Sequence, residues 1–140
     1  MPNYNGVWSL STQYQYAADW PQPPPIGFRV SGEATGVGSV SNVITVVNLS
    51  SSGAVADFGD LNAAQSRAAA LSSTTRGIIG GGLGANGSTK TDTIQYFTIG
   101  TSGSGSDFGN LSVGRTYITA TSNITRGIFA GGNAASDGAS

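Results

Sequence analysis

The sequence predicts an all-β protein built from repeated units, and three observations support this prediction. Charged residues make up 9% of the chain, against about 25% in ordinary globular domains. Gly occurs 22 times, and Ser, Thr and Asn are abundant, so turns should be frequent. Short runs of β-forming residues separate these turns, and one such stretch recurs. A length of 140 residues provides one domain with a modest core.

The recurrence is clearest at DFGDL, residues 57–61, which returns fifty positions later as DFGNL, residues 107–111. Around these stretches, residues 44–82 and 94–132 align without a gap and are identical at 15 of 39 positions. Self-similarity at a fixed period is typical of propellers, solenoids and other repeat arrays. A trace of a third copy begins at residues 27–32, fifty positions before residues 77–82.

The repeat predicts an N-terminal arm, residues 1–26, and a β-repeat domain, residues 27–140. The domain should hold two units, 27–76 and 77–126, and an extra strand over 127–132. Each unit begins with a strand of β-formers and a Ser/Gly turn, and the DFG corner leads to a second strand. A polar turn carrying TRG precedes a third strand that ends in paired glycines, which indicate that another backbone comes close. The predicted strands are 44–49, 63–71 and 77–82, and then 94–99, 113–121 and 127–132.

Repeated residues within a repeated frame indicate a scaffold, because a catalytic site is normally built once. We expect each Asp to accept backbone hydrogen bonds in the DFG corner and to pair with the Arg nineteen positions later. Each Leu should pack beside its Phe. The expected scaffold residues are Asp57, Phe58, Gly59, Leu61 and Arg76, with Asp107, Phe108, Gly109, Leu111 and Arg126.

The arm is rich in aromatic side chains and ends in a Pro-rich stretch, PQPPP at residues 21–25, which favours a stiff extended spacer. A short helix is expected between Ser11, as its N-cap, and Asp19. We expect the arm to dock on another protein or to pack between chains; the alternative is that it folds back over its own domain. The expected docking residues are Tyr4, Trp8, Leu10, Tyr14, Tyr16 and Trp20.

Composition argues against several functions. The net charge is −1, with no cluster of Lys or Arg, which argues against nucleic acid as a partner. No apolar run approaches the roughly 20 residues that span a membrane, and the first residues do not resemble a signal peptide. Because the chain has no His and no Cys, we expect no enzyme, no metal site and no cofactor. The stretch GLGANG, residues 82–87, lacks the helix that a nucleotide-binding loop requires.

The stretch DFGNLSVGRTYITATSNITRGIFAGG resembles kelch-like β-propeller repeats of about fifty residues, in particular those of bacteriophage structural proteins from phages that infect cyanobacteria. The opening YNGVWSLSTQYQYAADWPQPPP is similar to an N-terminal segment of phage tail and virion proteins. The resemblance covers nearly the whole chain and implies a non-enzymatic virion component, exposed on head or tail. The chain departs from the kelch pattern by lacking the Trp that follows the glycine pair, a space that Tyr96 or Phe97 would fill.

Closed propellers typically have 4–8 blades, so two blades per chain should be completed by self-association. Analogy with phage spikes, fibres and capsid decorations favours a homotrimer of six blades; a stacked prism or a solenoid is the competing arrangement. Expected partners are therefore further copies of the chain and other virion proteins. The alternative function is a carbohydrate-binding adhesin, in which Tyr117, Asn86 and Asn133 recognise host glycans.

Overall fold

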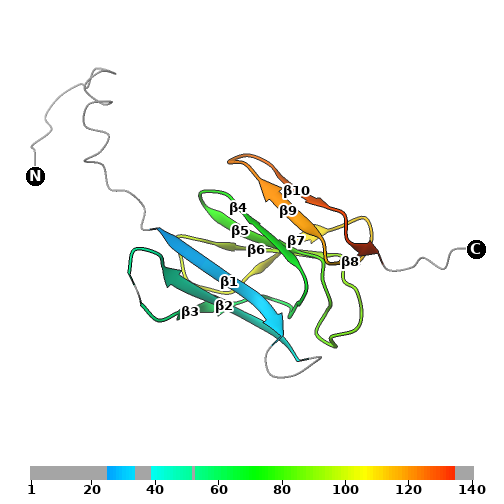
Figure 1. The fold of residues 1–140 in the computed structure, drawn as a ribbon, viewed down its shortest axis with the longest axis horizontal. Coiled ribbons are helices and arrows are strands. Elements are labelled where there is room, and N and C mark those ends of the chain that lie inside the picture. The colour runs from blue at the N-terminus through cyan, green and yellow to red at the C-terminus, as the bar shows by residue number, and fades with distance from the viewer. Residues whose placement is uncertain (1–24, 34–38, 52, 135–140) are drawn as a thin grey trace, which may run out of the picture.

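The computed structural model describes residues 25–33, 39–51 and 53–134, and this part of the chain is all-β (Figure 1). Its strands form antiparallel sheets, none of which closes into a barrel. Within the described residues there is no helix, and so none that could cross a membrane. The predicted fold class is confirmed at this level, whereas the expected arm and its helix lie outside the described residues.

Three sheets follow one another along the chain, and we name them by their order. The first sheet consists of β1 (Ile26–Glu33), β2 (Val40–Asn48) and β3 (Ala56–Asp60). The central sheet consists of β4 (Ala69–Ser72), β5 (Arg76–Gly80), β6 (Thr93–Thr98) and β7 (Ser106–Asn110). The C-terminal hairpin consists of β9 (Thr119–Ser122) and β10 (Gly127–Ala130). A small pair joins β8 (Arg115–Thr116) to β11 (Asn133–Ala134).

The period of fifty residues extends to the strands. The bounds of β3 and β7 differ by fifty residues, as do those of β4 and β9. The isolated pairing of Ser66 with Leu83 recurs fifty residues later in the β8–β11 pair. The central sheet is thus one complete four-stranded meander. Among the described residues, the first sheet holds the last three strands of such a meander, and the C-terminal hairpin holds the first two.

The strands differ from the sequence prediction in two places. The DFG stretches lie inside β3 and β7 rather than at corners. The strands predicted over 63–71 and 113–121 are interrupted, and β4 begins only at Ala69. The physical reason is a left-handed backbone at two equivalent positions, Arg67 (φ 54°) and Tyr117 (φ 54°), which interrupts the regular pairing of a strand.

The main core lies between the first and central sheets, which lie side by side in Figure 1. Three rings meet there edge to face: the centroid of Phe28 is 4.9 Å from that of Phe58 and 5.1 Å from that of Phe97. Phe97 also lies across Gly77 of β5, where a Cβ atom would overlap its ring. The buried aliphatic partners of this cluster are Ile44, Leu61 and Ile79.

Two buried amides tie the central sheet to the segment that precedes it. Gln95 and Gln65 are each 1% exposed. Gln95 exchanges two hydrogen bonds with the backbone of Ala63, at 2.8 and 2.9 Å, and donates to Gln65 Oε1 at 2.7 Å. Gln65 Nε2 in turn donates to the carbonyl oxygens of Gly81 and Thr93, both at 3.0 Å. This network fixes the irregular segment before β4 to the central sheet by side-chain hydrogen bonds, in place of the backbone pairing of a regular strand.

Replacing Gln95 by Leu should therefore lower the free energy of unfolding by about 2–4 kcal/mol, because the buried Gln65 Oε1 and the partly buried backbone amide and carbonyl of Ala63 lose their partners. Urea unfolding followed by circular dichroism measures this change. The matched control is Thr45→Leu at the equivalent position of β2, whose hydroxyl makes only a 3.5 Å contact with a carbonyl oxygen, and it should cost under about 1 kcal/mol. Equal losses at the two positions would contradict the role of the network.

Candidate functional site

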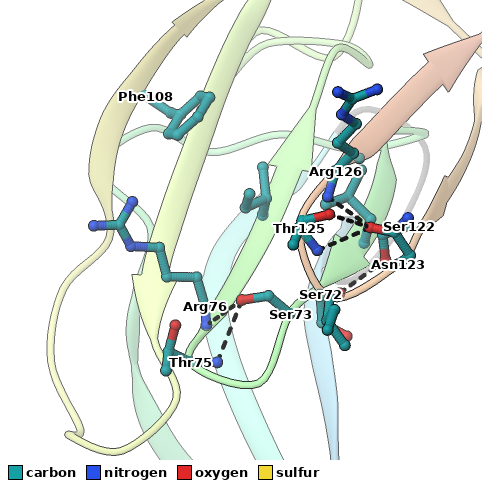
Figure 2. A pocket seen from close by; sticks show the side chains of 13 residues that line it. Ser72, Ser73, Thr75, Arg76, Phe108, Ser122, Asn123, Thr125 and Arg126 are labelled. Carbon is teal, nitrogen blue, oxygen red and sulfur yellow. Dashed lines mark hydrogen bonds between the residues drawn. The ribbon is translucent and has the colours of Figure 1, made fainter.

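A groove of 340 Å³ separates the central sheet from the C-terminal hairpin (Figure 2). One wall carries Phe108 and Arg76, which Figure 2 shows on the side of the central sheet, and the other wall carries Asn123, Thr125 and Arg126. The remaining lining is mostly small or hydroxylated: Leu71, Ser72, Ser73, Thr75, Ile78, Ser122, Ile124 and Gly127.

The wall on the central sheet is a cation-aromatic row. The guanidinium of Arg76 lies over the Tyr96 ring, 4.7 Å from its centroid. Tyr96 contacts Phe108 edge to face at 6.1 Å. Phe108 nevertheless remains 54% exposed, a large apolar surface to leave in water.

The hydroxyl and amide groups of the groove mostly serve the turns. Ser73 Oγ accepts hydrogen bonds from the amides of Thr75 (3.3 Å) and Arg76 (3.1 Å). Asn123 Oδ1, at the equivalent position of the hairpin, accepts from the amides of Thr125 and Arg126, both at 2.8 Å. Each side chain thereby fixes the turn that carries TRG. The charged groups that the groove offers to a ligand are the guanidinium groups of the two arginines.

The groove lies one repeat after the interface between the first and central sheets, at the equivalent place between the central sheet and the C-terminal hairpin. At the edge of β3, the amides of Gly103 and Gly105 donate to the carbonyl oxygens of Phe58 (3.2 Å) and Asp60 (2.6 Å). Gly59 lies so close to this segment that a Cβ atom there would overlap the Gly103 carbonyl oxygen. At the equivalent Gly109 on β7, a Cβ atom would meet nothing within 4 Å among the described residues. Within the described residues, the edge of β7 thus lacks the cover that the edge of β3 has.

The repeated Asp and Arg residues occupy equivalent positions but do not pair. Asp57 Oδ1 accepts a hydrogen bond from the Gly59 amide at 3.2 Å, and Asp107 does the same with Gly109. The expected Asp57–Arg76 bridge is wrong, because Asp57 lies on the first sheet while Arg76 packs on Tyr96 in the central sheet. Among the described residues, the one ion pair joins Glu33 and Arg67.

The other scaffold residues differ in burial between the first sheet and the central sheet. Leu61 is 2% exposed and packs in the core with Phe58, whereas Leu111 is half-buried. Arg126 directly precedes β10, is exposed and lines the groove. The docking residues predicted in the arm lie outside the part of the chain that the structure describes.

The two aspartate–arginine positions should therefore act independently on stability. In a double-mutant cycle, the effects of Asp57→Ala and Arg76→Ala on the free energy of unfolding should add to within about 0.5 kcal/mol. Asp57→Ala loses one hydrogen bond to the Gly59 amide and should cost about 0.5–1.5 kcal/mol. Urea unfolding of the two single variants and the double variant measures the coupling. A coupling of 1 kcal/mol or more, on the order expected of a partly buried pair, would restore the bridge.

A second cluster was missed from the sequence and links two copies of the repeat. Arg67 donates to Glu33 Oε1 (2.7 Å) and to the hydroxyl of Tyr117 (3.0 Å), the residue fifty positions later. The hydrogen bond to Glu33 and the neighbouring Tyr117 raise the pKa of Arg67 above its ordinary value. The cluster holds an exposed Tyr ring in place. The sequence contains one indication of this cluster: Arg67 and Tyr117 stand at equivalent positions of the repeat. The indication is weak, because the two residues differ in type.

The structure offers little chemistry beyond these contacts. In the described ranges, no three His, Cys, Asp or Glu side chains gather closely enough to hold a metal ion. The residues expected to contact glycans are partly engaged elsewhere: Asn86 Oδ1 accepts from the amides of Ser88 and Thr89, and Asn133 Oδ1 accepts from Lys90 Nζ. Of the three residues expected to contact glycans, Tyr117 is the one with an aromatic ring, and it is 67% exposed. Comparison with protein-family models and with curated proteins found no match for this chain.

Proposed function

We propose that this chain is a non-enzymatic structural protein of a bacteriophage virion, exposed on head or tail and assembled as a β-rich homo-oligomer. The support for a phage protein is the resemblance of its repeat and of its N-terminal stretch, described above. The support for assembly is the exposed ring of Phe108 and the edge of β7, which nothing covers within the described residues. In this proposal each meander is a kelch-like propeller blade, and sister copies complete the wheel, with three copies as the expected number.

The observation that carries the assembly is the contrast between equivalent residues on the first and central sheets. Phe58 is packed against Phe97 of the next sheet, at a centroid distance of 5.8 Å, whereas Phe108 is 54% exposed. Uncovered sheet edges and faces of this kind promote association between chains. A structural protein that assembles from many copies would use the exposed surface around Phe108 as a repeated interface.

Two measurements test the proposal. Antibodies raised against the purified chain should label intact particles of the phage that encodes it, by immunogold electron microscopy. Sedimentation equilibrium of the purified chain should give the mass of an oligomer, expected to be three times 14.0 kDa. Absence of the chain from purified particles would remove the virion assignment, whatever its oligomeric state.

A carbohydrate-binding adhesin remains the second candidate, and the exposed ring of Tyr117 is the observation that favours it. Aromatic rings on exposed loops provide flat apolar faces with one polar end, and Arg67 fixes this ring in position. Glycan-array binding that Tyr117→Ala abolishes would support this function. Binding that persists in the variant would locate the glycan elsewhere, and no binding at all would remove the candidate.

A further inference from the structure

The interface between the first and central sheets shows what a filled site of this repeat contains. There, β6 pairs with β5 along its whole length, and its Phe97 places a ring over Gly77. The same ring packs against Phe28 and Phe58 of the preceding sheet. A strand beside the second strand of the meander, with an aromatic side chain facing the preceding sheet, therefore closes this interface.

The groove is the equivalent place at the next interface, and among the described residues no strand fills it. The positions equivalent to Phe28 and Phe58 are Ile78 and Phe108, and both line the groove. Gly127 of β10 is equivalent to Gly77 and also lines it. Among the described residues, β10 pairs only with β9, so its other edge has free backbone amides and carbonyls. The groove therefore fits a β-strand that pairs with β10 and directs an apolar side chain toward Phe108.

The N-terminal arm contains a segment with that pattern. In residues 8–16, WSLSTQYQY, apolar or aromatic residues alternate with polar ones, with Thr12 as the one polar residue in the apolar register. Alternation at period two is typical of a strand with one apolar face. It competes with the short helix expected from Ser11 to Asp19, and a free sheet edge favours the strand. The apolar face would carry Trp8, Leu10, Thr12, Tyr14 and Tyr16.

The charge and the aromatic rings of the arm are also compatible with the groove. The groove contributes two cations, Arg76 and Arg126. Residues 1–24 contain one charged side chain, Asp19, and no Lys or Arg. A tyrosine ring beside Arg76 would extend the packing that this guanidinium already makes with Tyr96, since arginine stacks readily on aromatic faces. No like-charged pair would be brought together.

The arm that enters the groove should come from a second copy. The first sheet covers one face of the central sheet, and the groove lies on the opposite face. The stretch PQPPP leads directly into β1 at Ile26 and favours a stiff spacer that extends about 3.1 Å per residue. To reach its own groove, the arm would have to turn around the edge of the central sheet immediately beyond this spacer.

We propose that residues 8–16 of one copy add as a β-strand to β10 of the next copy and fill the groove beside Phe108. This contact joins two different surfaces, so its repetition generates a ring or an open filament. The proposal rests on the homo-oligomer of the proposed function and names the site through which it forms.

The test uses the full chain, because both tryptophans, Trp8 and Trp20, lie in the arm and report on it alone. Sedimentation mass and acrylamide quenching of tryptophan fluorescence are measured together over a range of protein concentrations. In the unaltered chain, association and protection of the tryptophans should rise together. Phe108→Arg should weaken association at least about tenfold, as loss of an interface anchor does, and leave the tryptophans freely quenched.

Ile124→Arg provides a second groove variant, because Ile124 lines the groove and is 76% exposed. Leu49→Arg is the matched control, since Leu49 is 65% exposed and lies outside the groove; it should associate as the unaltered chain does. Unchanged circular dichroism and urea midpoints confirm that each variant folds.

Three results would overturn the proposal. If both groove variants associate normally, another surface joins the copies. If association falls while tryptophan quenching is the same in all chains, the arm is not the occupant. If the tryptophans are protected at concentrations where the chain is a monomer, the arm fills its own groove. Loss of virion labelling with groove-dependent association intact would instead contradict the virion assignment alone.

Discussion

Replacing Gly82 by Ala should lower the free energy of unfolding by at least about 3 kcal/mol, a large fraction of the stability of a small domain. Gly82 has a φ of +94°, and a Cβ atom there would overlap the carbonyl oxygen of Ser66 and lie 2.9 Å from the Ala68 amide nitrogen. The carbonyl cannot move aside freely, because Ser66 and Leu83 exchange two backbone hydrogen bonds of 2.9 and 2.7 Å. The Gly82 amide also donates to the carbonyl oxygen of Arg115, at 2.6 Å.

The repeat provides a matched control at Gly32, the equivalent position in the first copy. Gly32 also has a positive φ, +130°, but a Cβ atom there would meet nothing within 4 Å among the described residues. Gly32→Ala should therefore cost only the strain of the backbone, about 1–2 kcal/mol. Urea unfolding followed by circular dichroism compares the two variants. Equal losses would mean that backbone conformation alone, rather than close approach, requires glycine at position 82.

The glycine pairs illustrate what could be predicted from the sequence. Their conservation of spacing between copies and their position after a β-rich run indicated close backbone approach, and the contact of Gly82 with Ser66 bears this out. The all-β class and the main strands around residues 44–49 and 94–99 were likewise predictable, because β-branched and aromatic runs between turns are local signals. Such signals act within a few residues and need no knowledge of the fold.

The phase of the repeat could not be predicted in the same way. An alignment at an offset of fifty is equally good wherever a unit is taken to begin, so it does not show that the meander starts at β4 rather than at β5. The sheet boundaries consequently fall inside the units predicted over 27–76 and 77–126. The same ambiguity produced the wrong Asp57–Arg76 bridge, since a spacing of nineteen residues does not reveal that the two lie in different sheets.

The groove beside Phe108 could not be predicted from the sequence for a further reason. Phe58 and Phe108 are identical in type and local frame, yet one is packed and the other is 54% exposed. The difference arises from tertiary packing: Phe97 of β6 packs against Phe58, whereas within the described residues no equivalent strand packs over Phe108. Arg67 and Tyr117 show the same limit, because a left-handed backbone at a residue other than glycine has no reliable local signal.

Replacing Phe97 by Ala should lower the free energy of unfolding by about 3–5 kcal/mol, through lost burial, an unfilled cavity and the loss of two edge-to-face contacts. Phe97 is 3% exposed and is the residue of the central sheet that contacts both Phe28 and Phe58. The adjacent Gly77 has no side chain that could move into the space. The two sheets therefore cannot close the cavity without shifting relative to each other.

Tyr117→Ala is the control for this prediction, because it also removes an aromatic ring but at a site that is 67% exposed. It loses one exposed hydrogen bond and a cation contact with Arg67, and it should cost about 1 kcal/mol or less. Thermal and urea unfolding measure both variants. If Phe97→Ala were no more destabilising than Tyr117→Ala, the first and central sheets would be held together by the buried amides and backbone contacts, and the aromatic cluster would not be the centre of the core.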